Sequence, residues 1–149
     1  MASELPGITL KPIGIVRSEL KQAGRRDVDN VCSEIVVDSY LSEALDNLDE
    51  FSHIIVIYWM HRSVGPSPIK VRPKKRPELP LMGVFATRSP NRPNPLGKAT
   101  VRLLQRRGNI LKVKGLDAID GTPVIDIKPY IPGYDSVKRA KAPSWVVKQ

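Results

Sequence analysis

The chain has 149 residues, of which 41% are hydrophobic and 26% charged, the balance of one globular domain with a hydrophobic core. A formal net charge of +9 predicts an anionic partner, most commonly nucleic acid. One cysteine and two histidines exclude an internal disulfide and a zinc site of the usual ligand spacing, so no metal is expected.

The first half of the chain contains three strand signals. Apolar alternation predicts a strand over residues 11–17, and a β-branched run predicts another over 33–38, with a polar loop at 18–30 between them. Residues 53–60 are almost continuously apolar and predict a strand that is buried on both faces. This run is too short to span a bilayer, and residues 1–7 carry no secretory signal, so we expect a cytoplasmic protein without a membrane segment.

One segment changes to helical spacing. Residues 40–49 predict a short helix, with Asp38 or Ser39 as the N-cap. Its apolar face consists of Leu41, Ala44, Leu45 and Leu48.

Two proline-rich stretches follow. Residues 63–80 contain five prolines, which exclude a helix or a central strand and predict a long loop that is either functional or disordered. Val84–Ala86 predicts a short strand that leads into residues 87–97, where Pro90, Pro93 and Pro95 fix the backbone. We expect a stiff loop that holds two arginines and Asn94 in place, although a rigid surface turn would have the same composition.

The last third predicts two hairpins. Residues 99–106 and 110–114 alternate on either side of a Gly-Asn turn, and 116–119 and 122–128 flank Asp120-Gly121, a strong two-residue turn signal. We expect Trp145, Val146 and Val147 in the tail to dock on the body or on a second subunit. Seven or eight short strands without a βαβ rhythm predict a mainly β, single-domain antiparallel barrel over residues 1–149, because closure removes exposed edges.

Positive charge is concentrated in one region. Residues 62–114 carry fourteen Lys or Arg, and Glu78 is their only acid. A basic run is often only a solvated face, but this asymmetry favours a surface that follows phosphates. The residues predicted to contact RNA are Lys74, Lys75, Arg76 and Arg92.

Several motifs occur together in one order. They include Ile13-Gly-Ile-Val-Arg-Ser18, Leu48-Asp-Glu-Phe-Ser-His-Ile54 and His61-Arg62. Two longer ones follow, Gly83-Val-Phe-Ala-Thr-Arg-Ser-Pro-Asn-Arg-Pro-Asn-Pro-Leu-Gly97 and Leu116-Asp-Ala-Ile-Asp-Gly-Thr-Pro-Val-Ile-Asp-Ile-Lys-Pro-Tyr130. In this order they resemble the TsaA-like family, the TrmO-type tRNA (adenine-N6)-methyltransferases, from about Pro12 to Tyr134.

The resemblance implies a small β-barrel that binds S-adenosylmethionine, forms a homodimer and methylates N6 of a threonylcarbamoylated adenosine beside the tRNA anticodon. Longer relatives carry a second domain, whereas this chain ends fifteen residues after Tyr134. The family's N-terminal Pro-Arg-Gln-type contact corresponds here to Gly24-Arg-Arg-Asp27, which lacks the proline and the glutamine, and Arg26 is the residue expected to stand in for it. The full set of implied cofactor contacts is Arg26, His61, Arg62, Arg88, Lys98, Lys114, Gly115, Leu116 and Asp117.

The proton acceptor for the target amine stays open at this point, with Asp126, Asn94 and Tyr130 as candidates. Asp126 would serve equally well as the partner of a nearby lysine. Two other functions fit the sequence: a non-enzymatic RNA-binding barrel, and a methyltransferase of the same family with a different substrate. The first explains the charge, but it gives no reason for the stiff arginine loop.

Overall fold

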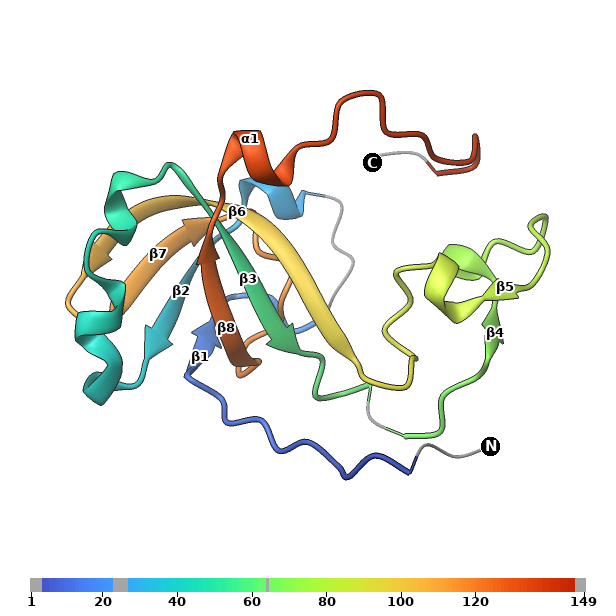
Figure 1. Ribbon diagram of the computed structural model, residues 1–149, viewed down its shortest axis with the longest axis horizontal. Helices are drawn as coiled ribbons and strands as arrows, with labels where there is room; N and C mark the ends of the chain where they lie inside the picture. The colour runs from blue at the N-terminus through green and yellow to red at the C-terminus, as the bar shows by residue number, and fades with distance from the viewer. Residues whose placement is uncertain (1–3, 23–26, 64, 147–149) are drawn as a thin grey trace.

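The protein is described here by a computed structural model, which covers residues 4–22, 27–63 and 65–146, with Lys75 described by its backbone alone. Six antiparallel strands form a closed barrel in the order β1-β2-β7-β6-β3-β8, which confirms the predicted mainly β barrel (Figure 1). The strands are β1 (Gly14–Arg17), β2 (Cys32–Val37), β3 (His53–Trp59), β6 (Leu96–Arg107), β7 (Ile110–Lys114) and β8 (Pro123–Pro129).

The first and last barrel strands close the sheet. In β1, Gly14 pairs with Val124 of β8 on one side and with Val37 of β2 on the other. A side chain at Gly14 would place its Cβ 2.5 Å from the carbonyl oxygen of Val36, so only glycine permits this approach of β1 to β2. Closure leaves none of these six strands with an open edge.

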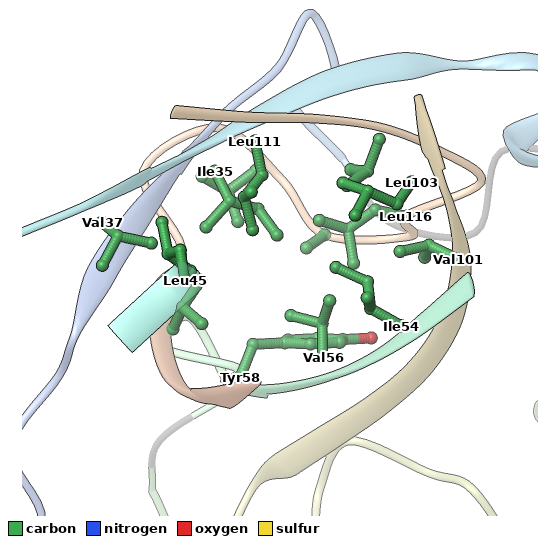
Figure 2. Packing of buried hydrophobic residues seen from close by; sticks show 14 residues of the cluster. Ile35, Val37, Leu45, Ile54, Val56, Tyr58, Val101, Leu103, Leu111 and Leu116 are labelled. Atoms are coloured by element: carbon green, nitrogen blue, oxygen red, sulfur yellow. The ribbon is translucent and has the colours of Figure 1, made fainter. Parts of the chain in front are cut away.

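The core fills the barrel interior with inward-facing aliphatic side chains (Figure 2). Alternation along β1, β2 and β7 is regular, so that every second residue is buried. In β3, Ile54, Ile55 and Val56 are consecutive and all buried, as predicted for a strand that is covered on both faces. The side chains of Ile35, Ile54, Leu111 and Leu116 are fully buried at the centre.

The predicted helix over residues 40–49 is wrong in type. The segment forms two 3-10 helices, η2 (Ser39–Leu45) and η3 (Leu48–Glu50), and Asp38 at the N-cap position makes no side-chain capping bond. Between them Asn47 has a φ of 70°, a left-handed conformation that interrupts regular helical geometry. Leu45 is buried in the core, and Leu41 and Leu48 pack against it, so most of the predicted apolar face is directed inward.

A long excursion leaves the barrel after β3 and returns at β6 (Figure 1). It contains a two-stranded sheet of β4 (Lys70–Val71) and β5 (Met82–Gly83), together with η4 (Pro73–Lys75). The predicted strand at Val84–Ala86 is wrong, because these residues form the 3-10 helix η5. The hydroxyl and the amide of Thr87 both donate to the carbonyl of Val84, at 2.8 Å and 3.1 Å, and this close turn replaces an extended backbone.

The two predicted hairpins have different outcomes. β6 and β7 form the expected hairpin, but residues 116–119 are not a strand, and β8 pairs with β1 and β3 instead. The Asp120-Gly121 turn itself is present, with Gly121 at a φ of 85°. Leu116 and Ala118 are buried in the core, and the amides of Asp120 and Gly121 donate to Leu20 and Val16, so this segment covers one end of the barrel.

Two short helices complete the described elements. They are η1 (Val28–Asn30) and α1 (Pro132–Asp135). In the tail, Trp145 is partly buried and its carbonyl accepts a hydrogen bond of 3.3 Å from Arg76 of the excursion, whereas Val146 is exposed and Val147 lies outside the described residues. No helix in the described part of the chain is long and apolar enough to cross a membrane.

Candidate functional site

A pocket of about 960 Å³ lies where β3 ends and β6 begins. Its lining surface is largely apolar, while six Lys or Arg and one acid, Asp117, are among its lining residues. Three separate parts of the chain supply most of the lining, namely the end of β3, the segment from Arg88 to Ala99, and the turn from Asp117 to Thr122. The basic residues of the lining are Lys21, Arg62, Lys74, Arg88, Arg92 and Lys98.

The end of β3 brings His61 and Arg62 to the pocket. The amide of Met60 donates to the carbonyl of Pro95 over 2.8 Å, which ties this end of β3 to the segment that leads into β6. His61 is partly buried, and its Nδ1 atom is buried without a hydrogen-bond partner among the described residues. A buried polar atom without a partner needs an explanation, and a ligand or a water molecule at this position would provide one.

The loop from Thr87 to Pro95 is held by side-chain hydrogen bonds as well as by its prolines. The guanidinium of Arg92 donates to the carbonyls of Thr87 and Ser89, at 2.9 Å and 3.1 Å. The amide of Ser89 donates in turn to the hydroxyl of Thr87 over 3.2 Å. Arg92 therefore fixes the loop, whereas Arg88 is exposed and, among the described residues, has no hydrogen bond or ion pair.

Tyr58 and Gly97 form one wall of the pocket as a cross-strand pair between β3 and β6. The phenol ring lies against Gly97, where a Cβ would come within 2.3 Å of its Cε2 atom. The Tyr58 hydroxyl donates over 3.2 Å to the backbone carbonyl of Asp117 and so joins this wall to the 117–122 turn. Burial of the ring, followed by the nearby negative charge of Asp117, raises the pKa of Tyr58 to about 12.

The raised pKa of Tyr58 predicts a loss of stability at high pH. Since the unfolded chain releases this proton near pH 10 and the folded chain near 12, the contribution is complete below pH 10 and is lost as the pH rises toward 12. The loss is about 2 to 3 kcal/mol in the free energy of unfolding. Urea unfolding at pH 9 and pH 11.5 should show a steeper decline for the wild type than for Tyr58→Phe, and parallel declines would contradict this assignment.

The structure brings many of the predicted site residues to one pocket. Five predicted cofactor residues line it, as do one of the proposed proton acceptors and two of the predicted RNA-binding residues. These are His61, Arg62, Arg88, Lys98 and Asp117, then Asn94, and finally Lys74 and Arg92.

Other predicted residues lie elsewhere. Lys114 ends β7 and Gly115 follows it, but neither lines the pocket, and Leu116 is fully buried in the core. Arg76 pairs with Glu78 inside the excursion at 2.6 Å. Arg26 and the side chain of Lys75 lie outside what the structure describes.

Asp126 and Tyr130 are not part of the pocket lining. Asp126 forms an ion pair of 2.9 Å with Lys128, and this hydrogen bond raises the pKa of Lys128. Tyr130 makes an edge contact with His53, which begins β3, whereas the pocket lies beyond the other end of that strand. Of the two readings of Asp126, the structure gives it the contact expected of a lysine's partner.

Sequence reasoning did not single out Tyr58, Gly97, Met60 or Thr122 as pocket residues. Tyr58 lies within a strand that was correctly predicted as buried, so its apolar neighbours concealed its position at the pocket. Its pairing with Gly97 depends on the register between strands that are distant in the sequence. Gly97 itself was the only available signal, because a glycine within a strand often marks a place where another group approaches the backbone closely.

Comparisons with known proteins relate the chain to one family. Residues 21–136 match the family model of the tRNA-methyltransferase O N-terminal domain. A crystal structure of TrmO from Pseudomonas aeruginosa is 31% identical, with a TM-score of 0.77 over 93% of this chain and 62% of that one. A probable S-adenosyl-L-methionine-binding protein of Methanothermobacter thermautotrophicus is 45% identical over 139 residues, which cover 87% of this chain and 95% of the relative.

Other relatives are longer than this chain. The tRNA (adenine(37)-N6)-methyltransferase of Escherichia coli is 37% identical over 142 residues, 87% of this chain but 60% of that protein. A probable S-adenosyl-L-methionine-binding protein of Archaeoglobus fulgidus is 44% identical over 90% of this chain, which spans 37% of the relative. Taken together with the barrel and its pocket, these matches show that the chain belongs to the tRNA-methyltransferase O N-terminal domain family.

Proposed function

We propose that the pocket binds S-adenosylmethionine and that the protein transfers the methyl group of this cofactor to N6 of a threonylcarbamoyl-modified adenosine next to the tRNA anticodon. The observation that carries the proposal is the meeting of the rigid arginine loop with the 117–122 turn in one pocket. Arg88 and Asp117, 29 residues apart in the chain, both line it.

The residues of the pocket suit this cofactor in size and chemistry. Small-molecule sites usually enclose about 300 to 1,000 Å³ and are mostly apolar with a few polar groups. Arg88 offers a bidentate site for the methionine carboxylate, and its lack of a partner among the described residues leaves the guanidinium available. Asp117 would accept hydrogen bonds from the ribose or the adenine amine, and the buried Nδ1 of His61 would gain a partner.

The cofactor, when bound, supplies a methyl group attached to a sulfonium. Transfer of this group is an in-line displacement, to which the enzyme contributes mainly the alignment of the two reactants. The target amine is a weak nucleophile, because its lone pair is conjugated with the adenine ring. An acceptor on its N–H would favour attack, and among the three candidates Asn94 is the one that lines the pocket. We therefore assign this hydrogen bond to the side-chain oxygen of Asn94. Because an amide oxygen is too weakly basic to keep the proton, the proton passes to solvent once the amine has accepted the methyl group. Since the anticodon loop is unpaired, presenting the base requires less energy than flipping it out of a duplex.

More of the relatives are named for binding S-adenosylmethionine than for acting on tRNA. Those of nearly equal length are named only for binding S-adenosylmethionine, while the tRNA substrate comes from the longer Escherichia coli protein. A family methyltransferase with another RNA or small-molecule substrate is the second candidate for this reason. Mass spectrometry of anticodon-loop nucleosides from a deletion strain separates the two, because only the first predicts loss of the N6-methyl group.

Cofactor binding gives the most direct test. At a hundred times its dissociation constant, S-adenosylmethionine should add about 2.7 kcal/mol to the free energy of unfolding. Thermal unfolding with and without millimolar cofactor measures this, with ATP as a control that shares the adenosine but lacks the sulfonium. The absence of any stabilisation would overturn the proposed function. The homodimer implied by the family resemblance is a separate proposal, which sedimentation velocity tests.

A further inference from the structure

Hydrogen bonds set some of the basic residues of positions 62–114 apart from the others. Four arginines are used to hold the fold together. Arg106, for example, has a side chain only 19% exposed and donates to Asp46 and to the carbonyls of Ser42 and Gly108. The other three are Arg72, Arg76 and Arg92. These four cations are therefore less available to a partner than their number in the sequence indicates.

A second group of cations lies on the outer face of the β6–β7 hairpin. Arg102, Arg107 and Lys112 are exposed, and none has an ion-pair partner among the described residues. We call these three residues the hairpin strip. Strands β6 and β7 contain no acidic residue. The acid beside the strip is Glu34 of β2, which pairs with Lys112 of β7 on one side and with Arg17 of β1 on the other.

An irregularity in β6 places Arg107 in the strip. Before it, Val101 and Leu103 face inward and Arg102 faces outward. The register with β7 shifts between Leu103 and Gln105, which reverses the alternation, so that Arg106 turns inward and Arg107 outward. Without this bulge, Arg107 would face the barrel interior.

The strip continues from the pocket. Lys98, near the start of β6, lines the pocket, and Arg102 follows it on the same outward face of the same strand. From Lys98 to Arg107 the strand runs for about 30 Å at the usual rise per residue. An RNA with one nucleotide in the pocket could thus lay its neighbouring phosphates along the hairpin.

We propose that the hairpin strip is a phosphate-binding surface for the RNA whose target base enters the pocket, an inference that rests on the proposed function. The strip contains no aromatic side chain on which bases could stack, so its contacts are to the backbone. The strip positions the RNA without reading its sequence. Removal of its charges should therefore weaken the binding of different RNAs to the same extent.

The test compares two triple variants that each lose three positive charges. The strip variant carries Arg102→Gln, Arg107→Gln and Lys112→Gln. The control carries Lys11→Gln, Lys70→Gln and Lys138→Gln, three exposed lysines outside both the strip and the pocket. Lys114 stays unchanged in both, because the family resemblance assigns it to the cofactor.

Binding of purified bulk tRNA and of an unrelated stem-loop RNA is measured against salt, with S-adenosylmethionine binding measured in parallel. The strip variant should bind both RNAs at least about tenfold more weakly, and the slope of log K against log salt should fall by about 2 to 3. The control should change little, and the cofactor affinity of both variants should equal that of the wild type.

Three outcomes would overturn the strip. Wild-type RNA affinity in the strip variant, or an equal loss in the control, removes it while cofactor binding and methyl transfer still support the proposed function. A wild type that binds anionic vesicles through these residues but binds no RNA also removes it. The opposite result, RNA held by the strip without any methyl transfer, keeps the strip and defeats the proposed function.

Discussion

Replacing Gly97 with alanine should lower the free energy of unfolding by about 1 to 3 kcal/mol and reshape the pocket. The new Cβ would lie 2.3 Å from Cε2 and 2.4 Å from Cζ of Tyr58, closer than any carbon contact allows. Because Tyr58 is only 8% exposed, its ring can move only by displacing core neighbours or by separating β3 from β6. Its hydrogen bond to Asp117 would break as well. Urea unfolding measures the loss of stability.

A double-mutant cycle isolates the ring contact as the cause. In a Tyr58→Ala background the ring is gone, so Gly97→Ala should cost less there than in the wild type. The difference between the two costs is the coupling between the residues. Equal costs in both backgrounds would show that the β6 backbone, and not the tyrosine, requires glycine at this position.

Arg88→Ala should weaken S-adenosylmethionine binding about ten- to a hundredfold, the range expected when a charge-assisted hydrogen bond is removed. The fold should be unaffected, because Arg88 is exposed and bonds to no other described residue. Isothermal titration gives the dissociation constant, and the melting temperature without cofactor checks the fold.

Two further variants sharpen the Arg88 test. Arg88→Lys keeps the charge but loses the planar fork, so its affinity should fall between those of the wild type and the alanine variant. Arg17→Ala removes an exposed arginine of β1 that does not line the pocket, and it should bind the cofactor normally. An Arg88→Ala protein with wild-type affinity would exclude Arg88 from the site.

The barrel was predictable because its strands carry their own signals. The apolar residues of 11–17, the continuous apolar run that becomes β3 and the turn at Gly108-Asn109 are all local patterns, and each corresponds to an observed element. In β1 the predicted alternation around Ile13 and Ile15 has the wrong phase, because Gly14 and Val16 are buried and Ile15 is 46% exposed. The stiffness of the arginine loop was also expected from its prolines. The structure adds a second reason, because Arg92 bonds to two carbonyls of the same loop.

What the sequence could not provide depends on contacts between distant segments. Val84–Ala86 has the composition of a strand, but no barrel strand is available to pair with it, and Thr87 closes it into a 3-10 turn. Residues 116–119 have the alternation of a hairpin arm, yet burial of Leu116 and Ala118 draws them across the barrel end. The roles of the individual arginines were equally hidden, since net charge does not distinguish a residue that bonds internally from one that faces solvent.

The hydrogen bond between Met60 and Pro95 has a consequence for engineering this protein. It joins the two ends of the excursion, where β3 and β6 lie side by side as antiparallel strands. A tight turn could connect the two strands at this point in place of the excursion. A deletant in which a short linker replaces residues 61–94 should therefore still form the six-stranded scaffold while lacking Arg62, Arg88 and Asn94. The same junction is a suitable place to graft loops from relatives and exchange one ligand preference for another.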